Sequence, residues 1–223
     1  MSEEQKTLIP VSAGDTLVDV AADQQLLAET ASGSGFLPYV QLFTTKSGAV
    51  AEGKIGGGEY GLVRDGNIVS LGKEFNIIFL SVRARGFQID DAGGVSVVYD
   101  KNDPEYNRIK GLQAAGVEGA MVGPEFLCWV PSEATFATFF CGSKTLKREA
   151  RKFGAFLGGK AANLRSKLIE KGKYKWHGPV VNPCSVDLSP LPEVDDANEQ
   201  VDKFKNPPKP VKKEEATTTD VAR

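Results

Sequence analysis

The sequence predicts a mainly β domain of the α+β class, with a small β-barrel core, one long basic helix and disordered termini. Two observations predict the barrel. Short apolar and aromatic segments are separated by turn residues, which is typical of strands. One segment, residues 74–88, is long enough to bend between two sheets, as the first strand of a small barrel does. A third observation, an apolar stripe at helical spacing after Ser143, predicts the helix.

Length and composition indicate one domain with tails. The chain has 223 residues, of which 41% are hydrophobic and 25% are charged, as in ordinary globular proteins. It has no apolar run long enough to cross a membrane, and its acidic start, MSEEQ, does not resemble a secretory signal. Three cysteines, an odd number, fit free thiols in a reducing cytoplasm. We therefore expect a cytoplasmic protein.

The expected elements follow in chain order. Residues 1–35 are acidic and rich in Ser, Gly and Ala, and are interpreted as a flexible arm with a short helix at 15–29. The core spans residues 36–186. It begins with a strand at 37–43, followed by a hairpin of 60–63 and 68–71 around the turn Arg64-Asp65-Gly66-Asn67.

The strongest strand pattern is EFNIIFLSVRARGFQ, residues 74–88. Strict alternation places Ile77 and Phe79 on the same face as Arg83, Arg85 and Phe87. That face changes along its length from apolar to cationic and aromatic.

Further strands are expected at 95–99, 125–130 and 135–141, with a loop and one helical turn at 104–109 between the first two. Ser143 is a candidate N-cap for the long helix, whose apolar stripe contains Leu146, Ala150, Phe153 and Leu157. The helix is expected to span 143–172, with an interruption at Gly158-Gly159. Residues 187–223 are charged and Pro-rich and are predicted to be disordered.

The charge pattern of residues 143–177 is the main functional observation. This segment contains eleven cations and two acids, a formal charge of +9, whereas the whole chain has a net charge of −2. Aromatic residues, including Tyr174 and Trp176, lie between the cations. Phosphates bind cations and unpaired bases stack on rings, so the pattern favours single-stranded nucleic acid. A solvated amphipathic helix would also collect Lys and Arg, and the sequence leaves that alternative open.

Other motifs point to weaker interpretations. Residues 56–61 match GxGxxG, but a strand follows where a nucleotide-binding loop needs a helix, so a turn with close backbone approach is favoured. Residues 154–160 match GxxxxGK, but Ala161 replaces the Ser or Thr of a phosphate-binding loop. Cys128, Cys141, Cys184 and His177 could make a zinc site, although their spacing is unlike ordinary zinc motifs.

The sequence contains few residues or motifs that are typical of catalytic sites. It contains one histidine and neither a GxSxG nor an HExxH motif. Asp90-Asp91 and Asp195-Asp196 are interpreted as solvated turn and tail residues. We therefore expect neither an enzyme nor a bound cofactor or metal.

The order of five segments resembles early, DNA-metabolism proteins of tailed phages: LPYVQLF (37–43), YGLV (60–63), LGKEFNIIFLSVRARGF (71–87), GPEFLCWVP (123–131) and FATFFCGSKTLKREA (136–150). Over roughly residues 36–205 the chain also resembles phage single-stranded-DNA-binding proteins with an OB-like barrel. The resemblance implies an OB-fold and sequence-tolerant binding of single-stranded DNA. Such proteins often end in an acidic tail with a terminal aromatic residue, whereas here the acidic run (187–202) is internal and the chain ends DVAR.

The charge pattern predicts binding of single-stranded nucleic acid, and the resemblance implies a protein that binds single-stranded DNA in phage replication or recombination, in the cytoplasm of the host. Alternatives are a phage assembly protein that uses the basic helix for subunit or DNA contact, and a metal-dependent nucleic-acid enzyme. Replication or recombination proteins and a second copy of the chain are candidate partners. Oligomeric state, the choice between DNA and RNA, and autoinhibition by 187–202 stay open. The expected binding residues are Arg83, Arg85, Phe87, Lys144, Lys147, Arg148, Arg151, Lys152, Lys160, Arg165, Lys167, Lys171, Lys173, Tyr174, Lys175 and Trp176.

Overall fold

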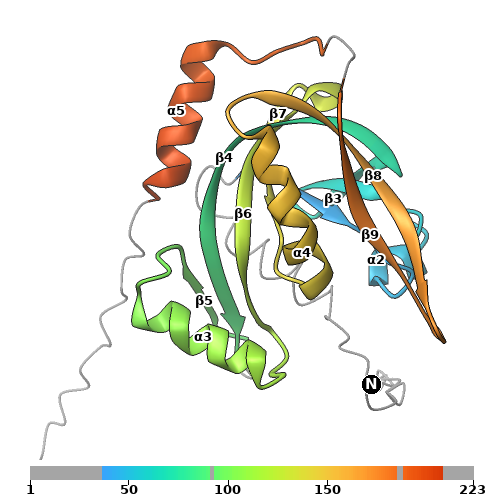
Figure 1. Ribbon diagram of the computed structural model, residues 1–223, viewed down its shortest axis with the longest axis vertical. Coiled ribbons are helices and arrows are strands. Elements are labelled where there is room, and N and C mark those ends of the chain that lie inside the picture. The colour runs from blue at the N-terminus through green and yellow to red at the C-terminus, as the bar shows by residue number, and fades with distance from the viewer. Residues whose placement is uncertain (1–36, 91–92, 185–187, 208–223) are drawn as a thin grey trace, which may run out of the picture.

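The computed structural model describes residues 37–90, 93–184 and 188–207, and these form a curved mixed sheet with helices on both of its faces (Figure 1). The expected arm (1–35) and the end of the expected tail (208–223) lie outside the described residues. Within the described residues the sheet has nine strands in the order β3-β2-β1-β7-β6-β4-β8-β9, and β5 pairs with β4. The mainly β class is confirmed.

The first strands form the predicted hairpin. β1 (Tyr39–Leu42) pairs antiparallel with β2 (Tyr60–Arg64), and β2 pairs with β3 (Asn67–Gly72). Asp65 and Gly66 both have positive φ, 49° and 76°, as a two-residue type I′ turn requires. The short helix α2 (Gly48–Ala51) lies between β1 and β2 in the chain.

β4 (Glu74–Ile89) is the long bent strand that the sequence predicts. β6 (Ala120–Val130) pairs along one of its edges, while β8 and β5 (Val95–Val98) share the other. β7 (Thr135–Phe140) joins β6 to β1, which it meets in parallel at Tyr39 and Thr138 only. The sheet does not close, so the predicted OB-like barrel is not confirmed.

A register shift between Phe79 and Ser81 corrects the predicted faces of β4. A bulge places one extra residue in the strand, and it therefore reverses the alternation beyond it. Ile77 and Phe79 belong to the main core, together with Phe126 of β6. Arg83, Arg85 and Phe87 still share a face with each other, but it is the opposite face of the sheet from Ile77 and Phe79.

The predicted basic helix over 143–172 is correct only in its first part. α4 spans Lys144–Phe153 and continues into the 3-10 turn η2 (Gly154–Phe156). The other 3-10 turn of the described residues, η1 (Pro131–Glu133), lies between β6 and β7. Residues 160–171 are strand β8 (Lys160–Lys171), and they pair with β9 (Tyr174–Pro183). The helical segment ends before Leu157, and Gly158 and Gly159, with φ of 79° and 86°, then lead the chain into β8. Buried Ala162 and Leu164 then alternate with their more exposed neighbours, as pairing with β4 requires.

The main core lies between α4 and the sheet. Phe153, the last residue of α4, is fully buried. Its ring centroid is 5.3 Å from that of Phe79, 5.6 Å from that of Phe126 and 5.9 Å from that of Phe139. The Ser143 hydroxyl accepts a hydrogen bond from the Leu146 amide, so the predicted N-cap is confirmed. The apolar stripe of α4 thus fixes the helix on the sheet and turns its cations outward.

Two further helices correct the sequence predictions. α3 (Pro104–Ala114) is longer than the single turn expected at 104–109, and Asp103 caps it by accepting from the Glu105 amide. α5 (Val194–Lys205) replaces part of the tail predicted to be disordered. Acids in its first turn and lysines in its last complement the helix dipole, and Phe204 is buried against the domain. No helix in the described part of the chain is long and apolar enough to span a membrane.

Candidate nucleic-acid interface

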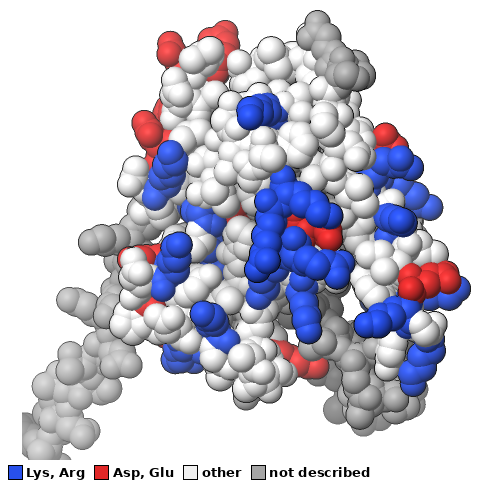
Figure 2. All heavy atoms as spheres, viewed as in Figure 1, with Lys and Arg blue, Asp and Glu red and all other residues white. Residues whose placement is uncertain are grey.

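The exposed side of α4 carries the densest group of cations on the face seen in Figure 2. Lys144, Arg148, Arg151 and Lys152 are exposed, and Lys147 is half-buried. Buried Glu149 accepts from Arg148 at 3.1 Å and from Lys152 at 2.5 Å. These bonds hold two of the cations in place, and they lower the pKa of the Glu149 carboxyl. The helix therefore presents a positively charged ridge.

The β8–β9 hairpin carries the second group of cations, beside α4 in Figures 1 and 2. Arg165 pairs with Glu74 at 3.2 Å, and Lys175 pairs with Glu170 at 2.8 Å. All members of this group are exposed: Lys160, Arg165, Lys167, Lys171, Lys173 and Lys175. The members of this group up to Lys171 were predicted to lie on the basic helix, and the structure places them on a hairpin instead. We call the cations of α4 and of this hairpin the basic face.

Two aromatic residues of the hairpin differ in their exposure. Tyr174 is 57% exposed, and the Lys173 ammonium lies 5.5 Å from its ring centroid. Trp176 is only half-buried, but its indole nitrogen is shielded from solvent and has no hydrogen-bond partner in the described structure. Tyr174 is therefore the aromatic face most available to a ligand.

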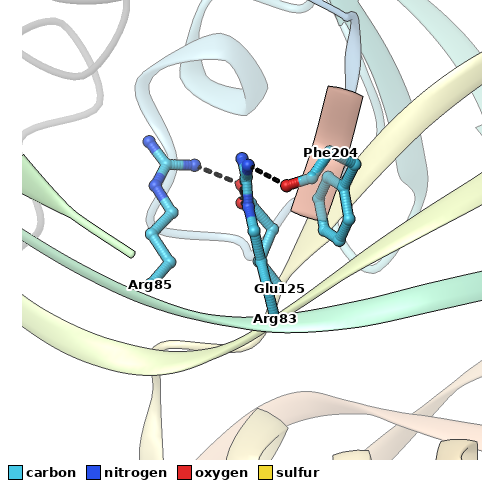
Figure 3. A network of polar contacts seen from close by, with 4 residues as sticks. All are labelled: Arg83, Arg85, Glu125 and Phe204. Carbon is cyan, nitrogen blue, oxygen red and sulfur yellow. Dashed lines mark hydrogen bonds and ion pairs between the residues drawn. The ribbon is translucent and has the colours of Figure 1, made fainter. Parts of the chain in front are cut away.

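Arg83 and Arg85 form a network around a buried carboxylate (Figure 3). The Glu125 side chain accepts from Arg83 at 2.7 Å and from Arg85 at 2.7 Å. Arg83 also donates to the Phe204 carbonyl at 2.6 Å. The two arginine side chains are only 14% and 20% exposed. The Glu125 carboxylate thus pairs with both arginines.

The surrounding rings complete this network. The Arg83 guanidinium carbon lies 3.6 Å from the Tyr99 ring centroid and 4.1 Å from that of Phe204. Phe87 is 8% exposed, and its centroid is 5.5 Å from that of Phe140. The network thus joins α5 to the sheet, and in this conformation the Phe87 ring is part of the packed interior. The structure does not bring these three residues together with the basic face.

Lys110 is a candidate that the sequence reasoning missed. It lies on α3, outside the segment with the +9 charge, and it is exposed. Burial is the main cause that lowers the pKa of Lys147, and the charge of Lys110 is the second cause. The Lys147 ammonium donates a hydrogen bond to the Gln113 side chain at 2.6 Å. Only tertiary contact between α3 and α4 reveals that these lysines interact. Lys110 therefore extends the basic face onto α3.

The alternative of a zinc site at Cys128, Cys141, Cys184 and His177 finds no support in the described part of the chain, where no group of three or more potential metal ligands is found. Cys128 and Cys141 are buried, and burial is the main cause that raises the pKa of each thiol. His177 lies against the glycine segment, where a Cβ on Gly58 would be 2.5 Å from its ring. Gly58 has φ of 84°, so the interpretation of 56–61 as a turn with close approach is confirmed.

The comparisons with known proteins return no match: no family model, no curated protein and no solved structure resembles this chain closely enough to identify it.

Proposed function

We propose that this protein binds single-stranded DNA with little sequence preference, and that the basic face is its binding surface. The observation that carries the proposal is the grouping of exposed cations on α4 and the β8–β9 hairpin, two elements that lie side by side (Figure 2). In the described residues, no ion pair with an acid is found for Lys144, Arg151, Lys167 or Lys171. Such cations can neutralise phosphates without first breaking a contact within the protein.

The preference for a single strand rests on Tyr174. A tyrosine ring exposed at the tip of a cationic hairpin can stack on an unpaired base, which duplex DNA does not offer. Arg83, Arg85 and Phe87 do not enter this proposal, because their contacts belong to the buried network. A role in phage replication or recombination is part of the proposal and is supported by the resemblance of the five segments.

The test is a titration of a fluorescent oligomer of about thirty nucleotides, single-stranded and then as a duplex, at several salt concentrations. We expect tighter binding of the single strand and a steep loss of affinity with salt. Arg151→Ala with Lys167→Ala should lower the salt slope by about 0.7 for each lost phosphate contact. Lys203→Ala on α5, also an exposed lysine, is the matched control and should change nothing.

Tyr174→Ala should cost roughly 1–3 kcal/mol of binding with the salt slope unchanged. Absence of binding at low salt and micromolar protein would overturn the proposal. Equal affinity for duplex and single strand would instead favour an assembly protein that holds DNA through charge alone.

A further inference from the structure

The side chain of Gln113, in the last turn of α3, joins this helix to the start of α4. Its amide nitrogen donates to the Gly142 carbonyl at 3.2 Å, shortly before α4 begins. Its amide oxygen accepts from the Val122 amide at 3.4 Å and from the Lys147 ammonium at 2.6 Å. Both ends of the Gln113 amide are therefore bonded, and they place the Lys147 ammonium at the junction of the two helices.

Lys110 brings a second cation to this junction. It precedes Gln113 by three residues, so the two side chains are neighbours on one side of α3. The Lys147 ammonium, which is bonded to Gln113, therefore lies near Lys110. The pKa of Lys147 agrees with this placement, because burial lowers it most and the charge of Lys110 lowers it further. The two lysines thus interact across the junction.

No described ion pair neutralises these two lysines. In the part of the chain that the structure describes, the carboxylates that pair with cations of α3 and α4 are Glu105 and Glu149, and their partners are other residues. Lys110 is exposed, whereas Lys147 is half-buried, so water screens the repulsion between the two ammonium groups only in part. An anion placed between them would replace this repulsion with attraction.

α4 lies between this junction and the β8–β9 hairpin. A Cβ on Gly178 of β9 would be 3.3 Å from the Thr145 side chain, so Thr145 faces the hairpin. Lys147 follows two residues later, about 200° around the helix, and it faces α3. Lys144 and Arg151, three residues before Lys147 and four after it, share its side of α4. A strand that contacts the hairpin can therefore cross the cations of α4 and reach the junction.

We propose that Lys110 and Lys147 form a phosphate subsite at the junction of α3 and α4, which takes one phosphate of a single strand that crosses α4. The inference rests on the proposed function and extends its binding surface to α3. Phosphate oxygens accept short, charge-assisted hydrogen bonds from ammonium groups, and two cations from different helices can hold one phosphate between them. Gln113 is a positioning residue, since it acts through its bond to Lys147.

The first experiment compares Lys110→Met with Lys101→Met in the full chain. Lys101 is an exposed lysine shortly before α3, so each variant removes one positive charge from the same region. If the subsite holds a phosphate, Lys110→Met should lower the salt slope of single-strand binding by about 0.7, and Lys101→Met should not change it. Equal slopes for the two variants would overturn the subsite, whereas binding by the unmodified chain would still support the proposed function.

The second experiment contains no DNA and uses inorganic tripolyphosphate, which has phosphate groups but no bases. NMR titration of the lysine side chains should show that tripolyphosphate raises the pKa of Lys147, because an anion at the junction offsets the charge of Lys110. The rise should be smaller in Lys110→Met, and it should exceed the rise at Lys203 of α5. An equal rise at Lys147 and Lys203 would show general screening only and would overturn the subsite. A specific rise at Lys147 without binding of any oligomer would overturn the proposed function and support the phosphate subsite.

Discussion

Replacement of Glu125 by Gln tests whether the Arg83–Glu125–Arg85 network is a stabilising element of the core. Glu125 is 1% exposed and is the carboxylate that faces both arginines. Gln has nearly the same volume and removes the charge, so the change leaves two cations beside a neutral group. Breaking a buried ion pair from one side typically costs about 3–5 kcal/mol.

The lower end of that range applies here. The arginine side chains retain 14% and 20% of their exposure, so water compensates part of the lost interaction. Arg83 also keeps its bond to the Phe204 carbonyl and its contact with the Tyr99 ring. We therefore expect Glu125→Gln to lower the free energy of unfolding by about 3 kcal/mol.

Glu149→Gln is the matched control. Glu149 is also a buried glutamate with two cationic partners, but the side chains of Arg148 and Lys152 are 65% and 63% exposed. Because water screens such cations, that change should cost no more than about 1 kcal/mol. Equilibrium unfolding in urea measures both variants, and unchanged m-values would show that the comparison is valid.

A triple variant separates charge from packing. Glu125→Leu combined with Arg83→Met and Arg85→Met removes all three charges and keeps apolar volume, so it should recover most of the lost stability. If Glu125→Gln costs less than about 1 kcal/mol, the network contributes little and the reasoning is wrong. A triple variant less stable than Glu125→Gln would show that the polar geometry matters more than the uncompensated charge.

Three further predictions follow from burial and charge. Phe87→Ala should lower the free energy of unfolding by about 3–5 kcal/mol, as for a buried ring, and should leave the affinity of the folded protein for single-stranded DNA unchanged. Loss of affinity without loss of stability would instead place Phe87 in the binding site. A chain that ends at Asn206 should keep its thermal midpoint, whereas one that ends at residue 193 should melt lower, because it loses Phe204; equal midpoints would show that α5 adds no stability. Lys110→Met should raise the pKa of Lys147 only partly, since burial is the larger cause of its lowering, and Lys101→Met should leave it unchanged; alkaline NMR titration of the Lys147 side chain measures both. Because the pKa of Lys147 is lower in the folded chain than in the unfolded chain, the unfolded chain binds more protons between these two pKa values. The contribution of Lys147 to stability therefore rises with pH in that interval, and this rise should vanish in Lys147→Met.

The acidic run at 187–202 bears on the question of autoinhibition. Asp195, Asp196, Glu199 and Asp202 lie on α5, whose buried Phe204 docks beside Arg83 of β4. In Figure 1, α5 and α4 are on different parts of the molecule. The acids of α5 are therefore held away from the basic face in this conformation. Autoinhibition stays a prediction, and it would require α5 to detach from β4.

Local patterns were sufficient for several features of this protein. Alternating apolar residues and a two-residue turn predicted the β2–β3 hairpin, because both signals lie within a few neighbouring residues. The Ser143 cap and the apolar stripe predicted α4 for the same reason. The concentration of cations on the surface was also visible, since charge and burial are strongly opposed for Lys and Arg.

Other features depended on contacts between distant segments. Residues 160–171 contain enough helix formers to extend the basic helix, yet the open edge of β4 provides partners for their backbone groups, and pairing there buries Ala162 and Leu164. The acidic segment at 194–205 looks disordered by composition, but Phe204 finds a buried position beside Arg83. In both cases tertiary burial outweighed local propensity.

The sequence by itself determined the mainly β class, the hairpin, the start of α4 and the accumulation of positive charge, because each arises from residues close together in the chain. Only the tertiary structure decided which cations are free for a ligand. A bulge near Leu80 turned Arg83 and Arg85 to the face where Glu125 lies buried, and a strand in place of a helix carried Lys167 and Lys171 to a hairpin beside α4. Bulges and strand pairing satisfy backbone groups of remote segments, and no local pattern specifies them.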